Sequence, residues 1–75
     1  MISVRACVVQ EEGGLTLGRI PVKYDAHRLC RWFGEQGRSA SVGLDLNSKM
    51  FFVRIPGVTW EELARLVAGS EIDLM

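Results

Sequence analysis

The sequence predicts an α+β fold with the element order ββαββα, in which a four-stranded antiparallel sheet carries two helices on one face. One observation behind this prediction is periodicity: four segments alternate apolar with polar or small residues, and two others show the i, i+3, i+4 spacing of helices. The other is an internal similarity. An apolar segment ending in Arg-Ile-Pro, then a short turn and an amphipathic helix, occurs at residues 15–34 and again at 50–68. We therefore expect a duplicated ββα unit.

Length and composition predict one small domain. The 75 residues should form a single domain, 1–75, with pseudo-repeats 1–37 and 38–69 and a short C-terminal tail, 70–75. Residues 1–40 carry six basic and four acidic side chains (+2), and residues 41–75 carry three and five (−2), so the formal net charge is zero. Nucleic-acid-binding domains usually have a clearer basic excess. The sequence shows no signal peptide and no apolar run of about 20 residues, so we expect a cytoplasmic protein without a membrane span.

The first half predicts a hairpin followed by a helix. Residues 2–9 and 15–22 have the alternation of strands, and a Gly-Gly pair suits the turn between them. Asp25 is expected to cap the helix, because its carboxylate can accept hydrogen bonds from the free N–H groups of the first turn. Gly34 or Gly37 should end the helix. Its expected buried face comprises Ala26, Leu29, Cys30 and Phe33.

The second half repeats this order. Residues 39–46 and 50–55 predict a second hairpin. Thr59 and Glu62 then form a capping box, in which each side chain accepts a hydrogen bond from the backbone N–H of the other. The apolar tail either docks on the domain or frays. The buried face expected for this helix comprises Trp60, Leu63, Ala64 and Val67.

The repeat also predicts which strand residues point away from the helices. If the isoleucine of each Arg-Ile-Pro segment faces the helices, strict alternation puts Leu15, Leu17, Met50 and Phe52 on the uncovered face. So apolar a face is typical of an interface, and we expect it to bind another protein or a second copy of the chain as a homodimer. In the alternative, a bulge or register shift turns these residues inward, or the tail covers them.

The edge of the first helix is a second candidate surface. Guanidinium groups beside an aromatic ring can hold a phosphate backbone and stack on a base. In the alternative, this is a solvated helix face stabilised by an Arg31–Glu35 pair. The residues that form this edge are Arg28, Arg31 and Trp32, with Lys23 and Arg38 at the helix ends.

The candidate chemical groups do not assemble into a catalytic or metal site. His27 and Cys30 are neighbours on one helix, but Cys30 belongs to the predicted buried face, and a reactive thiolate needs exposure and a positive environment. A structural zinc site needs four ligands in paired clusters, which the two cysteines do not supply. We expect reduced cysteines, no cofactor and no metal.

By elimination, we expect a small non-enzymatic protein-binding module that acts as an inhibitor or regulator of a larger protein or nucleoprotein complex. So short a chain suits the inhibitors encoded by phages and mobile elements, of which anti-CRISPR proteins are one group. The alternative is a small nucleic-acid-binding regulator that uses the basic face of the first helix. An enzyme based on His27 is a more distant third possibility.

Overall fold

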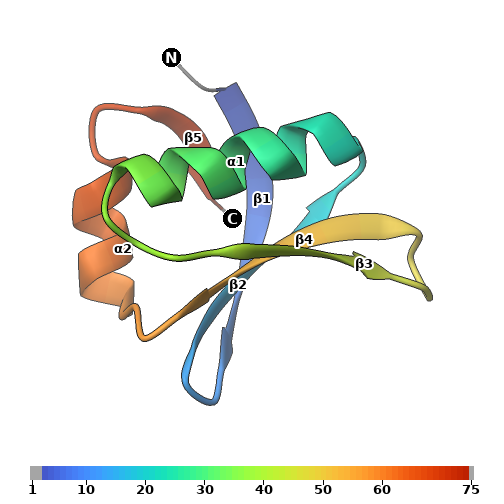
Figure 1. The fold of residues 1–75 in the computed structure, drawn as a ribbon, viewed down its shortest axis with the longest axis horizontal. Coiled ribbons are helices and arrows are strands. Elements are labelled where there is room, and N and C mark those ends of the chain that lie inside the picture. The colour runs from blue at the N-terminus through green and yellow to red at the C-terminus, as the bar shows by residue number, and fades with distance from the viewer. Residues whose placement is uncertain (1–2, 75) are drawn as a thin grey trace.

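The computed structural model describes residues 3–74 and confirms the α+β class. Strands and helices follow one another in the order β1β2α1β3β4α2β5 (Figure 1). The last strand was not part of the predicted order. The elements are β1 (Ser3–Glu11), β2 (Gly14–Ile20), α1 (Lys23–Glu35), β3 (Ser41–Asp45), β4 (Met50–Pro56), α2 (Trp60–Val67) and β5 (Glu71–Leu74).

The strands form one five-stranded mixed sheet in the order β3-β4-β2-β1-β5. Adjacent strands among β1 to β4 are antiparallel, as the two predicted hairpins require. β5 lies parallel to β1, with Ser3 opposite Glu71. The prediction of a four-stranded, wholly antiparallel sheet is therefore wrong at one edge, because tail residues 71–74 add a parallel strand. Ile2 and Met75, which were also assigned to elements or the tail, lie outside the described residues.

β5 docks because its sequence alternates in the way an edge strand requires. Ile72 is buried on the helix side beside its partner Val4, whereas Glu71 and Asp73 are exposed. On the solvent side Arg5 Nε donates to Asp73 Oδ2 at 3.2 Å. Every second side chain of β5 is apolar and turned towards the core, and the burial of these side chains holds the tail to the domain.

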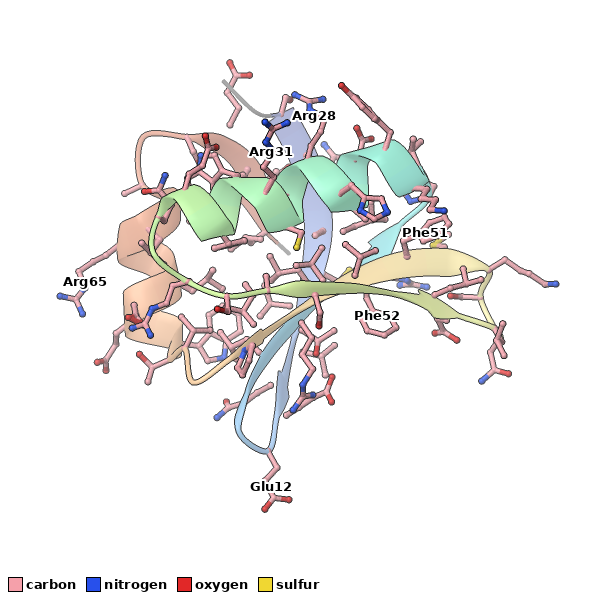
Figure 2. All side chains as sticks on the ribbon, in the orientation of Figure 1. Glu12, Arg28, Arg31, Phe51, Phe52 and Arg65 are labelled. Atoms are coloured by element: carbon pink, nitrogen blue, oxygen red, sulfur yellow. The ribbon has the colours of Figure 1, made fainter. Side chains whose placement is uncertain are left out.

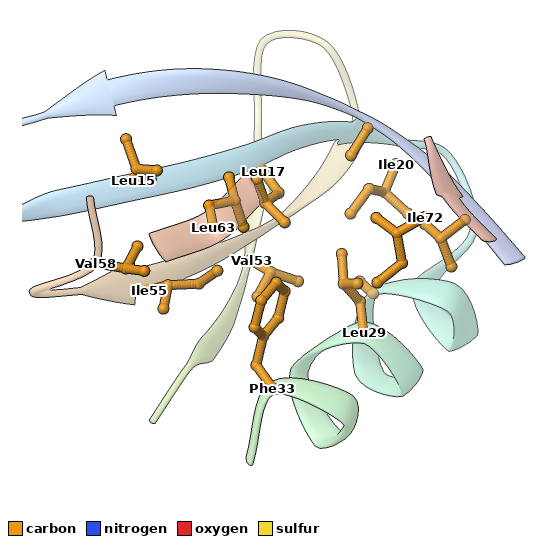
Figure 3. Packing of buried hydrophobic residues seen from close by; sticks show 13 residues of the cluster. Leu15, Leu17, Ile20, Leu29, Phe33, Val53, Ile55, Val58, Leu63 and Ile72 are labelled. Carbon is orange, nitrogen blue, oxygen red and sulfur yellow. The ribbon is translucent and has the colours of Figure 1, made fainter. Parts of the chain in front are cut away.

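Both helices pack on one face of the sheet, as predicted. A single buried cluster joins Leu29 and Phe33 of α1, Leu63 of α2, and Leu17 and Val53 of the two central strands (Figure 3). The buried face predicted for α1 is confirmed: Ala26, Leu29 and Phe33 are fully buried, and Cys30 packs against the cluster.

The buried face predicted for α2 is partly wrong. Leu63 is fully buried and Leu66 and Val67 pack against the core, but Trp60 is 46% exposed and Ala64 is exposed. The residues of α2 that face the sheet are therefore Leu63, Leu66 and Val67, which have the spacing i, i+3, i+4. The pattern of buried positions in the first helix does not transfer to the second, because the eight-residue α2 covers a different end of the sheet (Figure 1).

The helix starts differ in how they are capped. α1 begins at Lys23, and its N-cap residue is Val22, whose side chain makes no capping hydrogen bond. Asp25 therefore lies in the first turn of the helix and not at the N-cap, where it was predicted. Thr59 does cap α2, where the backbone N–H of Glu62 donates to its Oγ1 at 3.2 Å. The carboxylate of Glu62 pairs with Arg38 instead of completing the reciprocal box.

Gly37 ends α1 in a left-handed conformation, with φ of 83°. The N–H of Arg38 donates to the carbonyl oxygen of Phe33 at 2.9 Å, and the N–H of Gly37 donates to that of Gly34 at 3.1 Å. These two bonds satisfy carbonyl groups that the end of a helix leaves free.

Gly37→Ala and Gly34→Ala should therefore change stability in opposite directions. Alanine at position 37 would have to adopt a positive φ, and we expect it to lower the free energy of unfolding by about 1 kcal/mol. Gly34 is exposed inside the helix with open space around it, so alanine there should raise stability by about 0.5–1 kcal/mol. Urea unfolding of both variants checks this. Equal effects of the same sign would contradict the described helix end.

A β-bulge changes the facing of β2. The β2–β4 register shifts between Leu17 and Ile20, and Arg19 there has φ of 61°. Leu15, Leu17 and Ile20 are all buried on the helix side, at 1%, 0% and 1% exposure. The prediction that Leu15 and Leu17 lie on the uncovered face is therefore wrong. The extra residue of the bulge lets Leu17 and Ile20, three positions apart, point the same way.

The two halves repeat the order hairpin–helix without matching in detail. β1 and β3 have 9 and 5 residues, and α1 and α2 have 13 and 8. Leu17 and Phe52 each lie three residues before the isoleucine of an Arg-Ile-Pro segment, yet Leu17 is buried in the core and Phe52 lies on the uncovered face. The likeness of the halves extends to element order and not to register.

Candidate binding groove on the uncovered sheet face

The register of the strands defines the face of the sheet opposite the helices. Side chains of directly paired residues point to the same face. Val9, Thr16 and Arg54 therefore form one row across β1, β2 and β4. Phe52 and Gly43 form a second row across β4 and β3. Figure 2 shows Phe51 on the helix side of β4 and Phe52 on the other.

The Phe52 ring lies across the backbone of the edge strand at Gly43. A Cβ atom at Gly43 would overlap the ring, so the absence of a side chain there lets the ring lie flat on β3. Gly18, on β2, also lacks a side chain, and the space where its Cβ would be is open. The half-buried Phe52 ring therefore borders a hollow, and the floor of this hollow at Gly18 is backbone.

This hollow is a groove of about 780 Å³. The structure places Met50 and Phe52 on the uncovered face as predicted, while their role as an interface stays a prediction. Val9 is 53% exposed and Leu46 is 75% exposed, so apolar surface is accessible on both sides of Phe52. The groove is lined from the sheet by Val9, Thr16, Gly18, Met50 and Phe52, and from the second hairpin by Leu46.

Arg54 connects one end of the groove to the first hairpin. Its Nη1 lies 3.0 Å from Glu11 Oε2, and its Nη2 donates to the carbonyl oxygen of Glu12 at 3.1 Å. Thr16, in the same row as Arg54, is 8% exposed, and its hydroxyl has no hydrogen-bond partner within residues 3–74. Because Arg54 pairs with Glu11, its charge is largely neutralised. The groove is thus apolar at its centre and has polar groups at its ends.

The bulge brings a second arginine to the groove. Arg19 is exposed, lines the groove, and forms no ion pair within the described part of the chain. Its φ of 61° is unusual for a residue with a Cβ atom and is retained by the pairing of the strands on either side. The bulge that buries Leu17 thus also presents a free guanidinium at the rim.

The helix-edge residues do not form one basic cluster. Arg28 Nη1 lies 3.6 Å from Asp25 Oδ1, and the guanidinium carbon lies 5.6 Å from the centre of the Tyr24 ring. Trp32 is half-buried against the core, and its ring meets that of Phe33 edge-on with centroids 5.0 Å apart. The aromatic ring expected to stack a base is therefore mostly used in packing.

The remaining members of the predicted edge are dispersed. Arg38 pairs with Glu62 at the start of α2, and Lys23 lies exposed at the first residue of α1. Figure 2 shows Arg28 and Arg31 on the same outward side of α1. The structure thus brings together Arg28 and Arg31, and it separates them from Lys23 and Arg38.

His27 and Cys30 lie away from the groove, whereas Cys7 is the strand partner of the groove residue Gly18. His27 is exposed on α1. The Cys30 thiol donates to the carbonyl oxygen of Ala40 at 3.2 Å and packs against the core. Cys7 and Cys30 are both free thiols. Within residues 3–74, no three His, Cys, Asp or Glu side chains gather closely enough to hold a metal ion.

Comparison with protein-family models, curated proteins and solved structures gave no match to this chain. Neither described helix combines the length and the hydropathy needed to cross a membrane.

Sequence reasoning missed two features of this site. One is Arg19, and the other is the link from Arg54 to Glu11 across the sheet. A signal for the first was present: the buried positions 15, 17 and 20 change spacing from two to three at Gly18, as a glycine-containing bulge would require. The second had no local signal, because it joins strands 43 residues apart.

Proposed function

We propose that the chain is a non-enzymatic protein-binding module whose contact surface is the groove around Phe52. The observation that carries this proposal is that both helices lie on one face of the sheet, while the other face holds an accessible aromatic ring within a groove of about 780 Å³. Accessible apolar surface of this kind typically marks an interface on a small protein.

The composition of the groove suits a protein partner. Aromatic and arginine side chains contribute most of the binding energy in many protein interfaces, and the groove contains Phe52 with Arg19 at its rim. The backbone floor at Gly18 leaves room for an inserted apolar side chain. Binding to a larger protein or nucleoprotein complex would block its surface, which is how an inhibitor or regulator of the anti-CRISPR type would act.

No described feature favours the alternative of a nucleic-acid-binding regulator. Two of the arginines predicted to contact phosphate are already paired with carboxylates, Arg28 with Asp25 and Arg38 with Glu62. The groove lining carries the carboxylates of Glu11 and Asp45 beside the two arginines Arg19 and Arg54, so it has no net positive charge to attract a phosphate backbone.

Site-specific photo-crosslinking tests the proposed function. A photoreactive phenylalanine analogue at position 52 should capture a partner from host extract that the same analogue at position 24 does not, because Tyr24 is 69% exposed on α1, away from the groove. With the purified partner, Phe52→Ala should weaken binding by about thirtyfold or more, as expected for an interface hot spot. Tyr24→Ala is the matched aromatic control and should change affinity less than about twofold.

Two results would contradict the proposal. One is a partner whose affinity is unchanged by Phe52→Ala and lost with Tyr24→Ala or Arg31→Ala. The other is capture of nucleic acid, with strongly salt-dependent affinity, in place of protein. Circular dichroism of each variant separates loss of binding from loss of folding.

A further inference from the structure

We propose that two copies of the chain associate by antiparallel pairing of their β3 edge strands, with the two-fold axis at Gly43. The two five-stranded sheets would then continue into one another. The edge pairing does not require that the groove bind another protein, and it relocates the homodimer expected from the sequence from the face of the sheet to its edge.

β3 is an edge strand with few of the features that normally prevent association, its one charged residue being Asp45 at the end of the strand. Among the described residues its strand partner is β4 alone, so no described strand pairs with the backbone groups on its outer side. Proteins commonly protect such edges with lysine, proline, bulges or charge. Ser41–Asp45 contains no lysine or proline, and its pairing with β4 is regular along its length.

The opposite edge differs in charge. β5 carries Glu71 and Asp73, both exposed. Antiparallel pairing of two copies of β5 would bring two carboxylates from each copy to one seam, which like-charge repulsion disfavours. The charge distribution therefore favours β3 over β5 as the site of self-association.

The β3 sequence is complementary to itself about its central residue. With the axis at Gly43, Ser41 lies opposite Asp45 of the second copy and Val42 opposite its Leu44, and no two like charges face one another. Leu44 is 46% exposed and Val42 is partly exposed in the single chain. Pairing would cover both in two symmetric apolar contacts.

The uncovered face gains an aromatic contact at the same axis. Each Phe52 ring lies across its own Gly43. Directly paired residues in antiparallel strands have Cα atoms about 4.5–5.5 Å apart, so the two rings would come within the range of about 4.5–7 Å in which aromatic pairs attract. The second copy thus contributes its Phe52 to the groove of the first, and the two grooves adjoin.

Stacking two copies face to face is less favourable. It would bury the Arg54–Glu11 pair and the Arg5–Asp73 pair, which lie at the two ends of the uncovered face. Desolvating such pairs costs more than their attraction usually returns. Edge pairing leaves both in water.

Sedimentation equilibrium of the unmodified chain and of two variants at one exposed position tests the register. Ser41→Lys places a cation opposite Asp45 of the second copy, and Ser41→Glu places a carboxylate there. We expect the dimer dissociation constant to fall about three- to tenfold for Ser41→Lys and to rise by a similar factor for Ser41→Glu, since each dimer contains two such pairs. Both changes should shrink at high salt.

Further variants separate the edge from the face. Leu44→Lys should abolish the dimer, because it removes the contact with Val42 of the second copy and places an unpaired charge opposite that apolar side chain. Val9→Asp changes an exposed residue of the uncovered face away from β3 and should leave association unchanged. Amide exchange at residues 42–44 should slow as protein concentration rises, with no such change at residues 71–74.

Specific outcomes would overturn the proposal. One is a chain that stays monomeric up to about 1 mM, a concentration at which even weak association is visible. Another is a dimer that responds to Val9→Asp but not to Leu44→Lys or the charge at position 41. Ser41 does not line the groove, so the charge at position 41 tests the edge dimer without altering the groove, and failure of the proposed function and failure of the edge dimer give different results.

Discussion

Leu17→Ala is expected to lower the free energy of unfolding by about 2–5 kcal/mol, the range for removing a buried leucine side chain. Leu17 is 0% exposed and lies in the cluster with Leu63 and Val53 (Figure 3). Domains have total stabilities of about 0.05–0.15 kcal/mol per residue, so the loss is a large part of what holds a chain of 75 residues together. Urea unfolding followed by tryptophan fluorescence measures it.

Leu46→Ala is the matched control, because it removes the same atoms from a leucine that is 75% exposed. We expect its effect to stay within about 0.5 kcal/mol. If Leu17→Ala were equally mild, Leu17 would lie on the uncovered face, as strict alternation predicts, and the bulge at Arg19 would be wrong.

Ile72→Asp is expected to destabilise the chain by about 3 kcal/mol or more. Ile72 is 8% exposed and packs in the core beside Val4, so aspartate there removes apolar burial and places a carboxylate without a partner against the core. For a domain of this size, each kcal/mol lowers the melting temperature by about 4–8 °C. Thermal unfolding by circular dichroism should therefore show a decrease of well over about 10 °C.

Val9→Asp controls for the added carboxylate. Val9 lies on the neighbouring strand and is 53% exposed, so the same type of change there should shift the melting temperature by only a few degrees. A chain that tolerates Ile72→Asp as well as Val9→Asp would show that residues 71–74 do not complete the sheet.

The bulge in β2 and the docking of β5 both determine which apolar side chains remain exposed after folding. The bulge turns Leu17 into the core and leaves Gly18 and Arg19 on the groove side. β5 covers the far edge of β1, whereas no strand of residues 3–74 lies beyond β3. Among the strands, the apolar side chains that stay most accessible therefore lie in the groove and at the β3 edge.

Local sequence patterns were sufficient to determine most of the elements. The period of two in residues 3–9, 41–45 and 50–55, and the 3.6-residue period around Leu29 and Phe33, yield the strands and α1 from nearest-neighbour geometry. The cap at Thr59 is equally local, since its partner is the N–H of Glu62 three residues later. For these elements, the conformational propensity of the segment and the burial of its apolar face favour the same secondary structure.

Tertiary structure decided the features on which the proposals depend. Leu17 faces the core because pairing of β2 with β4 accommodates one extra residue, and a single residue reverses the facing of everything before it in a strand. Residues 71–74 become a strand because β1, at the other end of the chain, offers free backbone groups and a place for Ile72. Both outcomes are set by partners distant in sequence, whose position no local pattern of apolar residues records.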